Sequence, residues 1–205
     1  MKLAAIDYGT VTTRLLVAEV TEQSVDALLR RTTITHLGEG LAKSGKISLA
    51  AQERICAATR EYLADIVTLA GDGCPVVAVA TSAMRDADNS QEVLAALREL
   101  GVNVEIIAGE REAYLSFIGT VNGFDTLDSA RIDSEKGSSA GQKTVSKTGT
   151  DEDGLEKAEL SDAVSTRVLV VDIGGGSTEV ILGSVAFAKS SAVEDSVAFA
   201  GLSAG

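Results

Sequence analysis

A polar motif that occurs twice constrains this chain more than any other feature of its sequence. Residues 7–17 and 172–182 align without a gap, and each has a glycine turn between apolar segments. The matched polar and glycine positions are Asp7 with Asp172, Gly9 with Gly174, Thr12 with Ser177 and Thr13 with Thr178. Each copy predicts two strands joined by a tight turn. The repeat indicates an internal duplication, with two turns that face each other across a cleft.

The second copy has the chemistry of a phosphate site. Gly174, Gly175 and Gly176 lack Cβ atoms, so their backbone N–H groups can approach a phosphate closely. Asp172 and Glu179 flank this turn with carboxylates suited to a divalent cation. The alternative is a pair of ordinary hairpin turns, but hairpin chemistry does not explain an Asp at the same offset in both copies.

Composition narrows the classes of protein. The chain has 205 residues, 45% of them hydrophobic, which predicts one large domain or one and a half small ones. A net charge of −12 argues against non-specific binding to nucleic acid or to an anionic membrane. No signal peptide or long apolar run is evident, so we expect a soluble, cytoplasmic protein. Cys56, Cys74 and the single His36 lack the spacing of a metal cluster.

The order of predicted elements favours an α/β fold with a mixed five-stranded sheet. Three antiparallel strands come first, and Ser48 is the expected cap of the first long helix. The expected strands are 3–6, 13–20, 25–35, 76–80 and 102–107, and the expected helices are 49–70, 91–100 and 109–121. A polar loop, 81–89, follows the fourth strand, at the kind of sheet edge where α/β proteins place ligands.

We predict three regions. Residues 1–123 form an N-terminal domain, 124–166 a flexible acidic insertion and 167–205 the beginning of a second, similar domain. The insertion is polar and has almost no apolar periodicity, so it cannot bury enough surface to offset its chain entropy. An electrostatic arm is the functional alternative. We expect the second domain to contain the strand 168–171, buried on both faces, and a further strand near 197–202.

Five motifs occur in the order of a known family. They lie at 7–17, 37–40, 80–89, 105–113 and 171–179. The chain resembles the exopolyphosphatase/guanosine pentaphosphate phosphohydrolase family, within the superfamily of actin, the heat-shock chaperone ATPases and the sugar kinases. The resemblance implies the ribonuclease-H-like actin/sugar-kinase fold. It also implies a longer protein whose second domain forms the far wall of the cleft, so that this chain is its N-terminal part.

The same resemblance implies a Mg²⁺-dependent hydrolase. Its substrate would be inorganic polyphosphate or guanosine pentaphosphate, from which it releases the terminal phosphate, and a homodimer fits the family. Glu112 is similar to the general base that activates water, and Arg85 to the arginine that grips phosphate. Asp172 and Glu179 resemble the Mg²⁺ ligands, with Asp7 nearby. The implied phosphate-binding residues are Gly9, Thr10, Thr12, Gly174, Gly175, Gly176, Ser177 and Thr178.

Other interpretations stay open. Val11 stands where the family has an Asn that can form a hydrogen bond. This substitution and the short length favour a non-catalytic phosphate- or nucleotide-binding module as the alternative. A third interpretation is a relative of the sugar or acetate kinases, which segments 81–89 and 109–113 fit less well.

The sequence leaves the pKa of Glu112 open. Its position near a helix start would lower this pKa, whereas neighbouring carboxylates would raise it.

Overall fold

A five-stranded mixed sheet forms the N-terminal half of the protein. The computed structural model describes residues 1–22, 24–131, 164–187 and 196–199. The strands lie in the order β3-β2-β1-β4-β5; β1–β3 are antiparallel, and β4 and β5 run parallel to β1. Their bounds are β1 Lys2–Tyr8, β2 Thr12–Val20, β3 Val25–Ile34, β4 Val76–Ala80 and β5 Val104–Ile106. The predicted mixed sheet is confirmed.

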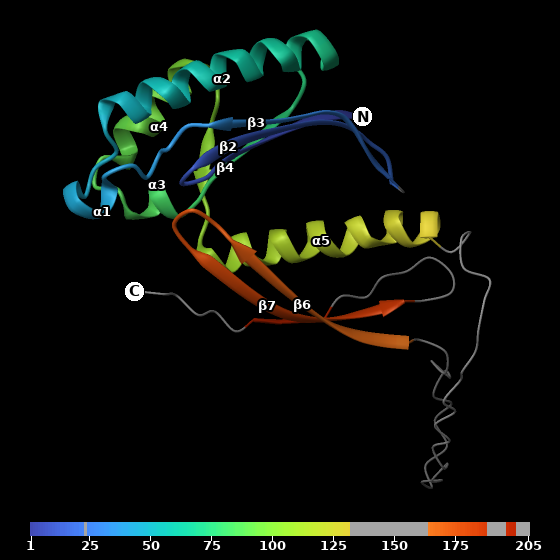
Figure 1. Ribbon diagram of the computed structural model, residues 1–205. Helices are drawn as coiled ribbons and strands as arrows, with labels where there is room; N and C mark the ends of the chain where they lie inside the picture. The colour runs from blue at the N-terminus through green and yellow to red at the C-terminus, as the bar shows by residue number, and fades with distance from the viewer. Residues whose placement is uncertain (23, 132–163, 188–195, 200–205) are drawn as a thin grey trace, which may run out of the picture.

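Two helices cover one face of this sheet (Figure 1). They are α2, Leu49–Ala70, and α4, Ser90–Glu99. The Ser48 side chain accepts a hydrogen bond from the Ala51 amide and caps α2, as predicted. Ile55, Tyr62 and Ile66 recur at helical spacing and are buried against the sheet, in the larger of the two apolar cores that the described residues form.

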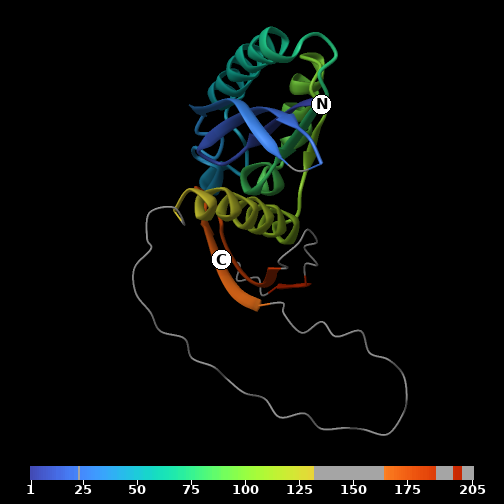
Figure 2. The same cartoon turned by 90° about the vertical axis from the view of Figure 1, so that its right-hand side faces the viewer.

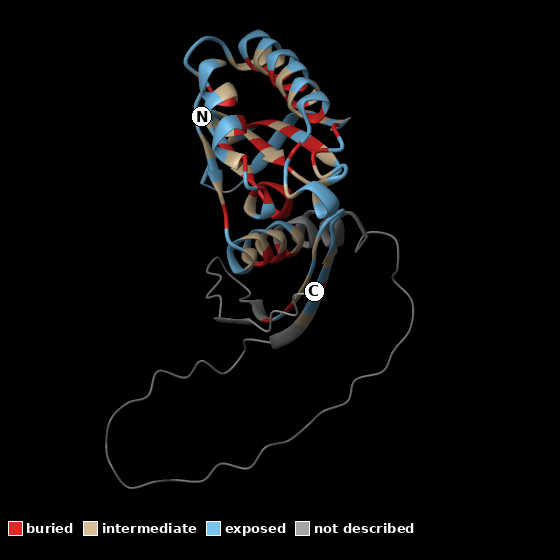
Figure 3. Cartoon of the chain, turned by 90° about the vertical axis from the view of Figure 1, so that its left-hand side faces the viewer, coloured by how far each residue is buried: buried red, intermediate tan, exposed pale blue. Residues whose placement is uncertain are grey.

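A second layer lies on the other side of the sheet. Figures 1 and 2 both show α5, Gly109–Arg131, between the first sheet and the hairpin of β6, Val164–Ile173, and β7, Thr178–Phe187. A third strand, β8 Ser196–Phe199, pairs with β7. Residues buried between α5 and this hairpin form the smaller core (Figure 3): Ala113, Phe117, Val121, Val170 and Ile181.

Several local predictions need correction. The segment 81–89, predicted as a loop, contains the helix α3, Ser82–Asp86, because Ala83 and Met84 are buried apolar anchors within a polar stretch. A short helix α1, Leu41–Ser44, was also not predicted. The strand around 168–171 is not buried on both faces: Leu169 is 61% and Val171 50% exposed.

The predicted insertion differs at its ends from the structure. Residues 124–131 continue α5, which we expected to end near 121, and residues 164–166 belong to β6. Residues 132–163 lie outside the described part of the chain, as do 200–202 of the predicted last strand. The division into three regions therefore stays a prediction.

No helix in the described part of the chain is suited to span a membrane. None of the helices within 1–22, 24–131, 164–187 and 196–199 combines the length and the apolar character that crossing a bilayer requires.

Candidate active site

The two copies of the repeated motif fold into hairpins of the same register. Asp7 pairs with Arg14 in the β1–β2 hairpin, and Asp172 pairs with Glu179 in the β6–β7 hairpin. A backbone hydrogen bond closes each turn at the matched position: the Gly9 amide donates to the Thr12 carbonyl at 3.0 Å, and the Gly174 amide donates to the Ser177 carbonyl at 2.9 Å. The structure thus reproduces the sequence repeat in detail.

The tips of the two turns touch each other. A Cβ atom on Gly175 would lie 2.2 Å from Val11 Cγ2, and one on Gly176 would lie 2.6 Å from Thr10 Oγ1 and 2.8 Å from Ser82 Oγ. Only glycine allows this approach. The turns therefore face each other as predicted, but their tips are in contact.

Each turn contains backbone N–H groups between the two residues whose hydrogen bond closes it. Among the described residues, the amides of Thr10, Val11, Gly175 and Gly176 donate to no backbone carbonyl. A pocket of about 250 Å³ adjoins both turns, lined by Thr10, Val11, His36, Gly38, Glu39 and Gly175. Consecutive amides of this kind can bind an anion.

The loop after β3 holds the first turn in place. The Gly38 amide donates to the Thr10 carbonyl, and the His36 amide donates to the Val11 carbonyl, each at 2.9 Å. Arg54, on α2, fixes this loop through the His36 carbonyl and the Glu39 carboxylate. The motif at 37–40 therefore supports the first turn through its backbone.

The hairpins differ in charge at matched positions. Arg14 occupies the position in the first hairpin that Glu179 occupies in the second. Burial raises the pKa of Asp7 above its ordinary value, the Arg14 guanidinium opposes this rise, and the charge of Asp172 adds to it. The first hairpin thus balances its carboxylate with a cation, whereas the second places two carboxylates side by side.

Glu112 lies on the first turn of α5, beside the acidic residues of both hairpins. Its side chain is 16% exposed, and its carboxylate accepts a hydrogen bond from Arg85 Nη1 at 2.8 Å. Burial raises the pKa of Glu112, the Arg85 hydrogen bond lowers it, and the charges of Glu179 and Asp7 raise it further, with a net rise. Burial, which the sequence could not reveal, thus has the largest effect on this pKa.

Arg85 contacts the protein through one nitrogen of its guanidinium group, Nη1, and its predicted contact with phosphate stays a prediction. Its Nη1 donates to the Ile107 carbonyl at 2.8 Å, directly after β5, as well as to Glu112. This places the guanidinium between α3 and α5, where it orients Glu112. Asn89, in the same motif, is buried and exchanges two hydrogen bonds with the backbone of Ile47, so its role is structural.

The expected metal ligands can be tested against the donors present. Glu179 Oε2 is buried and has no hydrogen-bond partner among the described residues, as a carboxylate oxygen reserved for a cation would be. The described side chains include no group of three or more His, Cys, Asp or Glu residues with the geometry of a metal site. The expected ligands, Asp172 and Glu179 with Asp7 nearby, nevertheless fit Mg²⁺, because this ion is commonly held by one or two carboxylates, substrate phosphates and water.

Sequence reasoning missed two contacts at this site. Ser116, on α5, donates a hydrogen bond to Asp172 Oδ2, and Ser82, on α3, lies against Gly176. The spacing of Ser116 from Glu112 places both on one face of α5, which was a signal available in the sequence.

Of the predicted phosphate residues, Thr178 is exposed at the start of β7.

Comparison with known proteins identifies the family. The sequence pattern of the Ppx/GppA phosphatase family matches residues 16–138 of this chain. The chain belongs to the Ppx/GppA phosphatase family. It is 27% identical to a bifunctional 3-dehydroquinate synthase/phosphatase of Fusobacterium nucleatum, over 89% of this chain and 23% of that protein. It is 30% identical to exopolyphosphatase 1 of Mycobacterium tuberculosis, over 89% of this chain and 42% of that protein.

Solved structures of the family have the same fold. The Ppx/GppA phosphatase of Aquifex aeolicus superimposes with a TM-score of 0.61 at 25% identity, over 91% of this chain and 52% of that one. The expected actin-like α/β fold is therefore confirmed. The chain spans about half the length, or less, of these Ppx/GppA relatives.

Proposed function

We propose that this chain carries the water-activating and phosphate-binding residues of a Mg²⁺-dependent phosphohydrolase. The substrate class is a chain of phosphoanhydrides, either inorganic polyphosphate or guanosine pentaphosphate, from which the terminal phosphate is released. The name of the Mycobacterium tuberculosis relative, exopolyphosphatase 1, supports polyphosphate. A homodimer, a cytoplasmic location and the absence of nucleic-acid partners remain predictions.

The position of Glu112 is the observation that carries this proposal. Its carboxylate is mostly buried, is oriented by Arg85 and is influenced by charges from both hairpins. A general base needs a fixed direction and a pKa closer to neutrality than that of a solvated Glu. Both conditions follow here from packing and from nearby charges.

Phosphate binding is assigned to the two turns. Their amides would donate to phosphoryl oxygens, and the hydroxyls of Thr10 and Ser82 lie at the same contact. Glu179, whose Oε2 has no hydrogen-bond partner in the described part of the chain, and Asp172 would hold the cation, with Asp7 nearby. A bound Mg²⁺ would neutralise charge on the phosphates.

The reaction then needs little covalent chemistry from the protein. Glu112 would accept a proton from a water molecule aligned with the terminal phosphorus, while Arg85 keeps the carboxylate in place. The turns would hold the phosphate chain so that the leaving oxygen lies opposite this water. The net charge of −12 makes these local donors and the cation necessary for a polyanionic substrate.

The test is phosphate release from polyphosphate and from guanosine pentaphosphate, with Mg²⁺ and with EDTA. We expect Glu112→Gln to lower kcat by about 10²- to 10⁴-fold, because the amide cannot accept the proton. Glu110→Gln is the matched control, since Glu110 is an exposed carboxylate on the same helical turn. Release that is unchanged in Glu112→Gln would refute the role of Glu112 as the base.

The second candidate function is a phosphate- or nucleotide-binding module without turnover. The contact of Val11 with Gly175 favours it, because an apolar side chain lies where a hydrogen-bonding one would face the substrate. This candidate predicts that polyphosphate raises the Tm of the protein while no phosphate is released. Hydrolysis that depends on Mg²⁺ would exclude it.

A further inference from the structure

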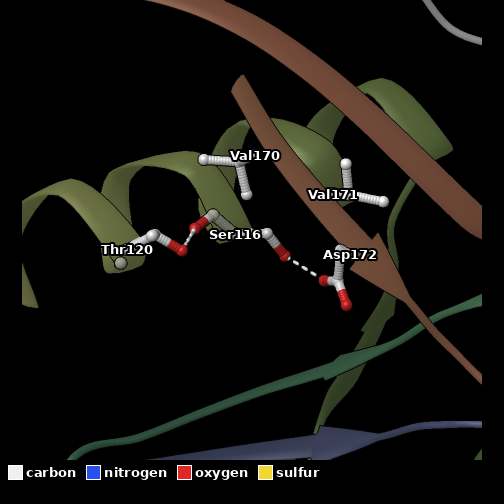
Figure 4. Close-up of a pocket in the computed structure, with 6 residues that line it drawn as sticks. Ser116, Thr120, Val170, Val171 and Asp172 are labelled. Atoms are coloured by element: carbon white, nitrogen blue, oxygen red, sulfur yellow. Dashed lines mark hydrogen bonds between the residues drawn. The ribbon is translucent and has the colours of Figure 1, made fainter. Parts of the chain in front are cut away.

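One side-chain hydrogen bond joins α5 directly to the proposed metal ligand. The Ser116 hydroxyl donates to Asp172 Oδ2, as Figure 4 shows. Ser116 lies one helical turn beyond Glu112, so both side chains project from the same face of α5. The helix that carries the proposed base thus also holds a carboxylate of the second hairpin.

The position of α5 relative to this hairpin is set by close packing. A Cβ atom on Gly183 would lie 2.2 Å from Phe117 Cζ, so the Phe117 ring rests on the backbone of β7. Phe117 is fully buried, in the smaller core. Because Ser116 precedes Phe117 in the helix, the packing of Phe117 fixes the part of α5 from which the Ser116 side chain projects.

Asp172 needs a fixed orientation because of its surroundings. It lies opposite Glu179 across the hairpin, and its charge also acts on Asp7. Carboxylates directly opposite each other in a hairpin repel, so an Asp172 side chain without a hydrogen-bond donor would turn away from Glu179 and Asp7. A hydroxyl donor on Oδ2 opposes that rotation and leaves Oδ1 free to bind a cation.

The space around Ser116 is open rather than filled. A pocket of about 290 Å³ lies between α5 and β6, lined by Ser116, Gly119, Thr120, Val170, Val171 and Asp172. A serine at this place contributes little to packing, and the pocket can accept an additional methyl group. Thr120, one turn further along, donates instead to the Ser116 carbonyl at 2.8 Å, within the helix.

We propose that Ser116 is a positioning residue, whose hydroxyl orients the Asp172 carboxylate for the divalent cation. This inference rests on the proposed function. Removing a hydrogen bond that orients a metal-binding side chain typically lowers metal affinity by about 10- to 100-fold. A purely structural role would instead lower the Tm and leave metal affinity unchanged.

The experiment compares three variants with the wild-type chain: Ser116→Ala, Ser116→Thr and Thr120→Ala. Mn²⁺ binding without substrate is measured by electron paramagnetic resonance, the Mg²⁺ midpoint by phosphate release, and the Tm by calorimetry. We expect Ser116→Ala to weaken both metal measures about tenfold or more. Ser116→Thr should restore them, and Thr120→Ala, which changes the same pocket without touching Asp172, should keep wild-type values.

The outcomes separate this inference from the proposed function. If the wild type releases phosphate but Ser116→Ala binds Mn²⁺ and Mg²⁺ as the wild type does, the positioning role is overturned and the function stands. A lower Tm of Ser116→Ala with unchanged metal binding likewise overturns the positioning role. If the wild type neither releases phosphate nor binds Mn²⁺, the proposed function and the positioning role both fail.

Discussion

Glu112 shows how burial and a neighbouring cation act in opposite directions on one carboxylate. Burial, Glu179 and Asp7 favour the protonated form, and Arg85 favours the ionised form. The net rise in pKa means that the ionised, proton-accepting form decreases as the pH is lowered through a value above the 4.5 of an ordinary Glu. The acid limb of a pH–rate profile should therefore lie above that value.

Replacing Arg85 should shift this limb to still higher pH. Arg85→Gln removes the charge and weakens the hydrogen bond that lower the pKa of Glu112, so a smaller fraction of Glu112 is ionised at any given pH near the limb. The measurement is kcat/KM for phosphate release across pH. Arg111→Gln is the control, because Arg111 is exposed and lies over the Tyr114 ring. A limb that stays in place in Arg85→Gln would contradict this account.

At the scale of elements, one of the contacts between α5 and the β6–β7 hairpin requires a glycine. Phe117 lies against Gly183, whose missing side chain makes room for the aromatic ring. On the same helix, Gly119 has no heavy atom within 4 Å of the position that its Cβ would take. A side chain would therefore be crowded at Gly183 and unhindered at Gly119. Neither glycine has a positive φ.

Substituting alanine at each glycine should have opposite effects on stability. Gly183→Ala forces its new Cβ into the Phe117 ring and should lower the free energy of unfolding by about 1–3 kcal/mol. Gly119→Ala meets open space and should raise the free energy of unfolding by up to about 1 kcal/mol through helix propensity. Urea denaturation measures both. If both substitutions change the free energy of unfolding equally, the contact with Phe117 is not the reason for a glycine at position 183.

On the scale of the whole molecule, the described residues form two apolar cores rather than one. The larger lies between the five-stranded sheet and α2 and α4, and the smaller lies between α5 and the second hairpin. The candidate active site lies between them, with residues from both hairpins and from α3 and α5. Its geometry therefore depends on how the two cores are held together.

Selective damage to either core should be visible by hydrogen exchange. Phe117→Ala removes the largest side chain of the smaller core, at a cost of about 3–5 kcal/mol, and should speed amide exchange in β6 and β7 more than in β1 and β2. Ile55→Ala, in the larger core, should show the reverse pattern. If either variant accelerates exchange equally in all four strands, the two cores unfold as one unit.

The sequence by itself predicted what depends on local pattern and on repetition. The β1–β2 and β6–β7 hairpins follow from apolar runs on either side of glycine turns, and the α2 bounds, Leu49–Ala70, follow from periodicity and the Ser48 cap. The order of the predicted strands and helices indicated the mixed sheet, and the order of the five motifs indicated the family. These features are encoded by neighbouring residues.

Tertiary structure decided what depends on residues far apart in the chain. The exposure of Leu169 and Val171 depends on what packs over β6, so an apolar run alone could not predict it. Likewise, the bond from Ser116 to Asp172 spans 56 positions, and the one from Arg85 to Glu112 spans 27. The rise in the pKa of Glu112 comes mainly from burial, a property that exists only once the chain has folded.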